Sequence, residues 1–172
     1  MNKPMNKLFK NNSEVNRFSP VKLSSHNLLA IEGMQKTEIQ KLLDRADYFA
    51  NLDKHADTKY LSGYVVLNVF FENSTRTRVS FELAARRLGA EVINISLINS
   101  SIKKGESLLD TASTLNAMKP DLLIVRHPHS GAPLLFAEYL SCSIINAGDG
   151  RHEHPTQALL DALTIKRRIG YL

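Results

Sequence analysis

The chain has 172 residues, of which 43% are hydrophobic and 23% are charged, and its net charge is +5. This length fits one domain of ordinary size plus a tail, and the hydrophobic content is sufficient for a core. No apolar run approaches the ~20 residues that a membrane-spanning helix needs, and the amino terminus lacks the apolar segment of a secretory signal. We therefore expect a cytoplasmic protein with no membrane partner.

The excess of positive charge lies at the amino terminus. Within residues 1–25, Glu14 is the only acidic side chain, against the basic residues Lys3, Lys7, Lys10, Arg17 and Lys22. A polar tail on a nearly neutral body is not the clustered basic face that binds a nucleic-acid backbone, so no nucleic-acid partner is expected. Residues 1–24 are predicted to form a flexible basic extension and residues 25–172 a single domain.

Hydrophobic spacing predicts helices and strands that alternate along the chain. Apolar residues recur at helical spacing over 36–54, whereas the run 64–71 is apolar on both faces, as in a buried parallel strand. The elements expected after it are a helix at 77–88 ended by Gly89, a strand at 91–97, a helix at 107–118 ended by Pro120, a strand at 121–126, a helix at 132–140, a strand at 143–146 and a last helix opened by Pro155.

This alternation predicts the fold class. Strands separated by helices favour a parallel sheet with right-handed crossovers, so we expect an α/β fold with a parallel four-stranded sheet and helices on both faces. In such a sheet, ligands bind beyond the carboxyl ends of the strands. Conspicuous polar groups follow three of the four predicted strands at this edge, and their convergence predicts a functional site.

The first polar group lies where the strand 64–71 should give way to a helix. Its residues are Ser74, Thr75, Arg76, Thr77 and Arg78. The amides of a first helical turn lack intrahelical partners and carry the positive end of the helix dipole, hydroxyls add donors, and arginine suits paired hydrogen bonds to phosphate. The segment predicts an oxyanion or phosphate site. The alternative is that Ser74 or Thr75 only caps the helix and the arginines are solvated.

The other two groups are Arg126 with His127, at the end of the third predicted strand, and the segment from His154 to Gln157, after a glycine turn. In isolation, Arg126 could form a strand-end ion pair and His154 a helix cap. Together with Thr77, they suit acyl transfer from a small phosphorylated donor. Arginines and helix amides would offset the charge of the leaving phosphate, and His154 or Thr77 could donate to the developing oxyanion.

Other chemistries lack their usual motifs in this sequence. There is no nucleophile elbow and no nucleotide-binding P-loop, so direct transfer in a ternary complex is more economical than a covalent intermediate or a nucleotide reaction. Cys142 stands alone in an apolar stretch and is expected to be a buried hydrophobic residue. No metal is expected, because no recognised spacing of acidic or cysteine ligands accompanies His127, His129, His152 and His154.

Four segments resemble those of one known family. They are FFENSTRTRVSFE, KKGES, IVRHP and AGDGRHEHPTQALLD, in that order over about residues 25–170. The chain resembles the amino-terminal half of aspartate carbamoyltransferase catalytic chains. Aspartate is favoured over ornithine as acceptor by the KKGES segment and by Thr156, where ornithine carbamoyltransferases usually carry cysteine.

The resemblance implies a carbamoyl-phosphate-binding domain and transfer of the carbamoyl group to L-aspartate, giving N-carbamoyl-L-aspartate and phosphate in de novo pyrimidine synthesis. It implies no cofactor and no metal, and catalytic roles for Arg76, Thr77, Arg126 and His154. The residues implied to bind carbamoyl phosphate are Ser74, Thr75, Arg76, Thr77, Arg126, His154 and Gln157.

Within that set, the resemblance implies that Ser74 to Thr77 and Arg126 bind the phosphate. Thr77, Arg126 and His154 would contact the carbonyl oxygen, and Gln157 the carbamoyl nitrogen. Ser100 and Lys104 would enter the site of a neighbouring subunit on a loop positioned by Glu106, which implies a homotrimer with shared sites.

The family continues into a second domain that supplies most aspartate-binding groups and a helix that packs on the first domain. That aspartate-binding domain is absent from this sequence, so apolar surface should be left uncovered. We expect a truncated product, an isolated domain or one half of a split enzyme, which supplies the carbamoyl phosphate half-site; whether it turns over alone stays open. The alternatives are a non-catalytic module that binds the phosphate ligand or docks on full-length subunits, and an ornithine-type carbamoyltransferase.

Overall fold

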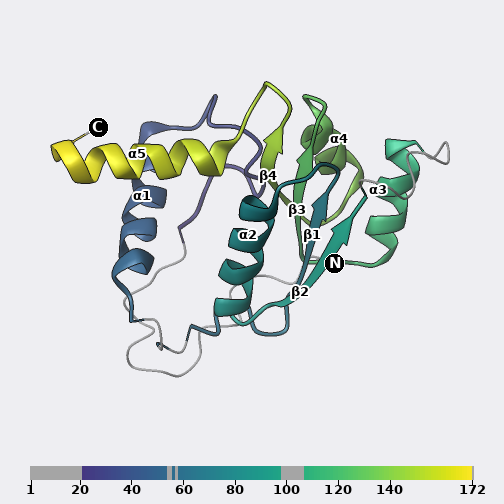
Figure 1. The fold of residues 1–172 in the computed structure, drawn as a ribbon, viewed down its shortest axis with the longest axis horizontal. Helices are drawn as coiled ribbons and strands as arrows, with labels where there is room; N and C mark the ends of the chain where they lie inside the picture. The colour runs from purple at the N-terminus through teal and green to yellow at the C-terminus, as the bar shows by residue number, and fades with distance from the viewer. Residues whose placement is uncertain (1–20, 54–55, 57, 98–106, 172) are drawn as a thin grey trace.

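The computed structural model describes residues 21–53, 56, 58–97 and 107–171 (Figure 1). Ser100, Lys104, Glu106 and most of the predicted basic extension lie outside these residues. In chain order, the described elements are α1 (Lys36–Asn51), β1 (Val65–Phe70), α2 (Thr75–Arg87), β2 (Glu91–Ser96), α3 (Leu108–Ala117), β3 (Leu122–His127), α4 (Ala132–Tyr139), β4 (Ser143–Asp149) and α5 (Pro155–Ile169).

The predicted alternation of helices and strands is confirmed, and several element ends differ. The helix α2 begins at Thr75 rather than at residue 77, because Ser74 is the N-cap residue and the last one before the helix whose backbone angles are not helical. The strand β4 continues to Asp149 rather than ending at residue 146, since Asp149 still pairs with His127 of β3. The helix α1 ends at Asn51, before the predicted residue 54.

Local sequence signals account for several helix boundaries. Ser107 and Asp110 form a reciprocal capping box at the start of α3, in which the Ser107 hydroxyl accepts from the Asp110 amide and the Asp110 carboxylate accepts from the Ser107 amide. Pro155 occupies the first turn of α5, where a missing N–H group is not needed. Gly89, directly after the end of α2, has a φ of +85°, which favours glycine.

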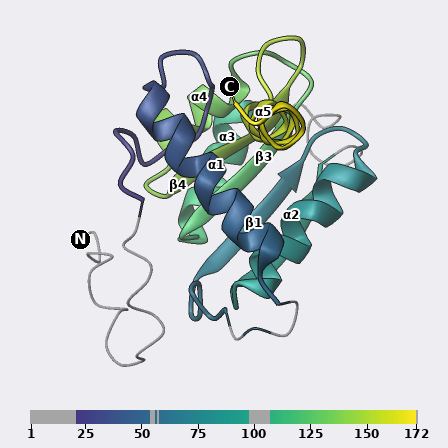
Figure 2. The ribbon, with the colours of Figure 1, turned by 90° about the vertical axis from the view of Figure 1, so that its left-hand side faces the viewer.

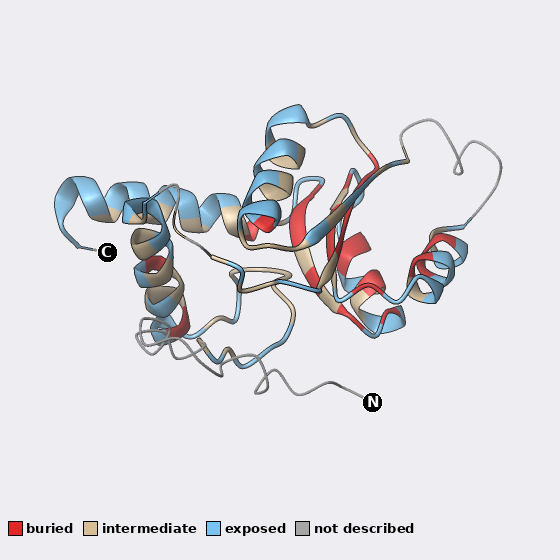
Figure 3. Ribbon diagram, turned by 90° about the horizontal axis from the view of Figure 1, so that it is seen from below, coloured by how far each residue is buried: buried red, intermediate tan, exposed pale blue. Residues whose placement is uncertain are grey.

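The described strands form one parallel sheet in the order β2-β1-β3-β4, which confirms the predicted fold class. The inner position of β1 explains why its sequence is apolar on both faces: Val66, Leu67, Val69 and Phe70 are at most 1% exposed. Figure 3 shows buried residues concentrated in the sheet and on the sides of the helices that face it.

Helices cover both faces of the sheet. On one face, α3 and α4 pack over a core that contains Leu67, Leu123 and Phe136. On the other, α2 contributes Ala85 to a core with Val66 and Ile124. No helix in the described part of the chain is both long and apolar enough to cross a membrane.

The helix α5 runs outward from the sheet and crosses α1, with which it is in contact (Figures 1 and 2). Two ion pairs join them: Lys166 with Asp44 at 3.0 Å and Arg167 with Asp47 at 2.7 Å. Apolar side chains of α2 and α5 are roughly half exposed, namely Val79, Leu83, Leu160, Ile165 and Ile169. These two helices therefore present uncovered apolar surface.

Because all four strands run in the same direction, the segments that follow β1, β3 and β4 meet at one edge of the sheet. In Figure 1 this is the upper edge, where the chain enters α2, α4 and α5. The three polar groups singled out in the sequence all follow these strands.

Candidate functional site

The amino terminus of α2 presents free donors at this edge. Ser74 is the N-cap residue by its backbone, but its side chain makes no capping hydrogen bond, and the first turn holds no acidic side chain. Thr75 and Arg76 are exposed, and Thr77 is partly buried. The capping alternative for the Ser74 hydroxyl is therefore wrong. The turn keeps the unpartnered amides and positive potential that attract an anion.

Arg126 is held between the ends of β1 and β4. Its Nε donates to a carboxylate oxygen of Glu72, which follows β1, and its Nη1 donates to the carbonyl oxygen of Ala147 in β4, at 3.1 Å. The expected strand-end ion pair thus exists. Since a guanidinium carries five N–H donors, others remain for a ligand. The two fixed contacts orient the side chain before any ligand binds.

Gly148 is the point at which Arg126 and His154 come together. Its φ is +117°, and a Cβ placed on it would lie 2.9 Å from Nη1 of Arg126 and 3.3 Å from Cδ2 of His154. The absence of a side chain at residue 148 therefore lets the guanidinium and the imidazole approach the same stretch of backbone.

The surroundings of His154 favour the neutral form of its imidazole. It occupies the N-cap position of α5 without a side-chain capping bond, so the expected helix-cap role for its ring is wrong. Burial, and then the positive charge of Arg126, lower the pKa of its side chain below the ordinary value. Its Nδ1 is buried without a hydrogen-bond partner among the described residues. The other ring nitrogen, Nε2, can donate to a carbonyl oxygen when it carries the proton.

Gln157 lies on the first turn of α5, close in sequence to His154. Its side-chain amide donates from Nε2 to Asp161 Oδ1 at 2.9 Å, and the side chain is exposed. Because a carboxylate only accepts, this contact points the amide N–H toward Asp161 and leaves the amide oxygen free. The backbone amide of Gln157 donates to the His154 carbonyl oxygen at 3.0 Å, but no side-chain hydrogen bond joins Gln157 to Arg126 or His154 among the described residues.

Three residues that support the site were not singled out in the sequence. Glu72 binds Arg126, and the buried pair Asn146 and Asp149 organises the turn that leads to His154. The sequence does carry a signal for Asn146 and Asp149, because Asn and Asp side chains commonly form hydrogen bonds with backbone groups in turns. Glu72 carries no comparable local signal, since its partner is distant in the chain.

His127 has a packing role. It is 4% exposed, its ring lies edge-on to Phe71 with centroids 4.6 Å apart, and its Nδ1 accepts from the amide of His129 at 3.0 Å. Burial lowers the pKa of its side chain. Within the described ranges, no group of three or more His, Cys, Asp or Glu residues is arranged to hold a metal ion.

Cys142 is buried, as expected from its apolar surroundings. Burial raises the pKa of its thiol to about 11. A thiol with that pKa is almost entirely protonated near pH 7, so Cys142 is not a nucleophile there.

The fold is a parallel α/β domain in which arginine, histidine, hydroxyl groups and a free helix amino terminus gather beyond the carboxyl ends of the strands. The family model described as aspartate/ornithine carbamoyltransferase, carbamoyl-P binding domain, matches residues 26–167. The chain belongs to this family, which confirms the resemblance seen in the four sequence segments.

Relatives of similar sequence and solved structures of similar fold agree with this family assignment. The aspartate carbamoyltransferase catalytic subunit of Dinoroseobacter shibae is 61% identical over 154 residues, 87% of this chain and 48% of that protein, and the Rhodospirillum rubrum one is 61% identical over 148 residues, 85% of this chain and 46% of that protein. The chain thus spans about half the length of these relatives.

Among solved structures, the catalytic subunit of M. jannaschii aspartate transcarbamoylase is similar, with a TM-score of 0.78 and 45% identity, over 86% of this chain and 48% of that one. Aspartate transcarbamoylase from Trypanosoma cruzi in complex with carbamoyl phosphate and aspartate has a TM-score of 0.76 and 39% identity, over 84% of this chain and 45% of that one.

Proposed function

We propose that this chain supplies the carbamoyl phosphate half-site of an aspartate carbamoyltransferase, which transfers the carbamoyl group to L-aspartate in de novo pyrimidine synthesis. The observation that carries the proposal is the meeting of Arg126 and a neutral His154 at Gly148. Glu72 links Arg126 to the segment that enters α2. The names of the relatives favour aspartate over ornithine.

In this proposal, the phosphate binds at the amino terminus of α2. Ser74, Thr75 and Thr77 provide hydroxyls, and the free amides of the first turn add donors. Arg76, which is exposed and lacks an ion pair among the described residues, pairs with phosphate oxygens, and Arg126 reaches the same group from the end of β3. Their positive charges offset the charge of the leaving phosphate.

The carbonyl end of the ligand binds beside His154. Its Nε2 donates to the carbonyl oxygen, with help from Thr77 and Arg126, and the free amide oxygen of Gln157 accepts from the carbamoyl nitrogen. The amine nitrogen of aspartate then bonds to the carbonyl carbon, the bond from that carbon to the phosphate oxygen breaks, and the leaving phosphate takes up the proton that the amine loses. A neutral donor suits this step, because it stabilises the developing oxyanion without a prior proton transfer.

The remaining parts of the proposal concern the whole protein. Residues 25–172 form the carbamoyl-phosphate-binding domain and residues 1–24 a basic extension. The main aspartate-binding groups come from a second domain. The relatives are about twice as long as this chain, which leaves room for such a domain. The functional unit is a cytoplasmic homotrimer in which Ser100 and Lys104 of a neighbouring subunit complete each site, with no cofactor.

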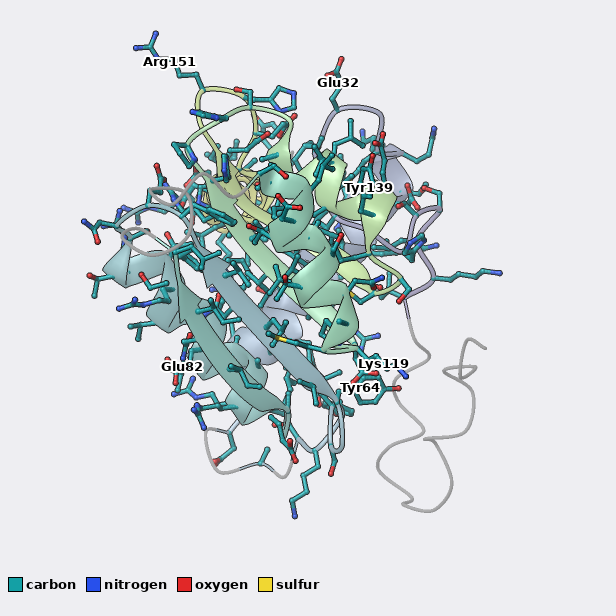
Figure 4. All side chains as sticks on the ribbon, turned by 90° about the vertical axis from the view of Figure 1, so that its right-hand side faces the viewer. Glu32, Tyr64, Glu82, Lys119, Tyr139 and Arg151 are labelled. Atoms are coloured by element: carbon teal, nitrogen blue, oxygen red, sulfur yellow. The ribbon has the colours of Figure 1, made fainter. Side chains whose placement is uncertain are left out.

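The test is calorimetric titration of the 172-residue chain with carbamoyl phosphate, in parallel with Arg76→Ala and Arg151→Ala. Arg76→Ala should abolish saturable binding, because it removes a charge-assisted pair of hydrogen bonds worth roughly 1.5–3 kcal/mol each. Arg151 lies in the loop before α5 but projects away from it, as Figure 4 shows, so Arg151→Ala should bind like the parent. Equal affinity of parent and Arg76→Ala would refute the proposed phosphate site.

A further inference from the structure

Asp149 is a buried carboxylate that contacts none of the proposed ligand groups. It is 2% exposed. Its Oδ1 accepts from the Glu153 amide and from Asn146 Nδ2, both at 2.9 Å, and its Oδ2 accepts from the Gly131 amide at 2.8 Å. Nδ1 of the half-exposed His152 lies 3.0 Å from Oδ2. Every oxygen of this carboxylate is therefore occupied by the protein itself.

These partners belong to the loop that follows β3, the strand that holds Arg126 near its end, and to the loop that leads to His154. Gly131 ends the loop that follows β3, and Glu153 directly precedes His154 in the loop that follows β4. The backbones of the two loops also touch: the Gly150 amide donates to the His127 carbonyl oxygen at 3.0 Å. The carboxylate of Asp149 thus joins one loop to the other.

The charge of Asp149 is retained in the folded protein. Burial alone would raise the pKa of its carboxyl group, but hydrogen bonds from Asn146, Gly131, His152 and Glu153 outweigh burial and lower it below the ordinary value. Hydrogen bonds to a charged acceptor are about twice as strong as neutral ones, so this junction is stiff.

We propose that Asp149 is a positioning residue. By clamping the loop after β3 to the loop before α5, it keeps His154 in a fixed position relative to Arg126. This inference rests on the proposed function for its consequence in binding. The adjacent Gly148 is the backbone against which both side chains pack, so a shift of the clamp moves the surface that they share.

The decisive variant is Asp149→Asn, which keeps the shape of the side chain. An amide has one acceptor oxygen and one NH2 group, so it turns a donor toward either the Gly131 amide or the Glu153 amide and repels it. One loop is thereby released. The matched control is His152→Asn, which alters a half-exposed partner of the same carboxylate and frees neither loop backbone.

Two measurements apply to the 172-residue chain under conditions where circular dichroism shows each variant to be folded. Calorimetry with carbamoyl phosphate should show an affinity about tenfold or more lower in Asp149→Asn, and unchanged in His152→Asn. Nuclear magnetic resonance should show the pKa of His154 rising toward its ordinary value in Asp149→Asn, because the imidazole leaves Arg126 and its buried place. The His154 signal is assigned by its absence in His154→Asn.

A purely structural role for Asp149 predicts a different result: a lower melting temperature with the affinity and the His154 pKa both unchanged, which would overturn the inference. If Asp149→Asn does not fold, Asn146→Ser decides, since it removes one donor to Oδ1 and should move both readouts less, in the same direction. If the unaltered chain binds no carbamoyl phosphate, the proposed function fails, whereas the His154 titration still decides whether Asp149 positions the imidazole.

Discussion

Replacement of Gly148 by alanine tests the packing at the centre of the proposed site. A Cβ at this position would lie 2.9 Å from Nη1 of Arg126, closer than real Cβ contacts allow, and 3.2 Å from its Cζ, tighter than most real contacts. Arg126 must then move, and the hydrogen bond from its Nη1 to Ala147 is lost. The φ of +117° adds backbone strain for any residue with a side chain.

The cost can be estimated from these two effects. Backbone strain costs about 1–3 kcal/mol, and the lost hydrogen bond costs about 1 kcal/mol more. Gly148→Ala should therefore lower the free energy of unfolding by about 2–4 kcal/mol, which corresponds to a melting temperature roughly 5–15 °C lower for a chain of this size. Displacement of Arg126 should also weaken carbamoyl phosphate binding.

Gly63→Ala separates strain from crowding. Gly63 has a φ of +79°, but nothing lies within 4 Å of a Cβ built on it, so this variant should lose stability without losing affinity. Thermal melts followed by circular dichroism, and calorimetry on both variants, provide the comparison. If Gly148→Ala matches Gly63→Ala in both melting temperature and affinity, the contact of Gly148 with Arg126 has no energetic importance and the reasoning is refuted.

Two further predictions concern stability. The pKa of His154 and that of His127 are both lowered in the folded chain, so below about pH 6.5 the unfolded chain binds protons that the folded chain does not. The free energy of unfolding should therefore fall as the pH drops through that value. Urea denaturation at pH 7.5 and 5.5 checks this, and equal midpoints would contradict it. Asn68 is fully buried in β1, and its Nδ2 donates to the Arg78 carbonyl oxygen and to Asn94 Oδ1. Asn68→Ala should therefore destabilise the chain by about 2–3 kcal/mol, and Asn94→Ala, at an exposed position, by less. Equal urea midpoints for the two variants would count against a special role for the buried amide.

The elements could be predicted because their signals are local. The buried run of β1 and the helical spacing of α1 follow from side chains close together in sequence, and Gly89 and Pro155 mark helix ends. The end of β4 could not be predicted in this way. Ala147 and Gly148 are weak strand formers that lie at a register shift, and β4 extends past them because Asp149 pairs with His127 of β3, which is distant in the chain.

The sequence by itself determined the alternation of strands and helices and membership of the carbamoyltransferase family, and it predicted an anion-binding segment from Ser74 to Thr77. Only the tertiary structure decided that Arg126 is held by Glu72 and Ala147, that Nδ1 of His154 is sealed from solvent, and that Asp149 joins two loops. The physical reason is that helix dipoles, caps and hydrophobic periodicity act between sequence neighbours. Desolvation and side-chain hydrogen bonds depend instead on distances in space, which the chain acquires only when the sheet has formed.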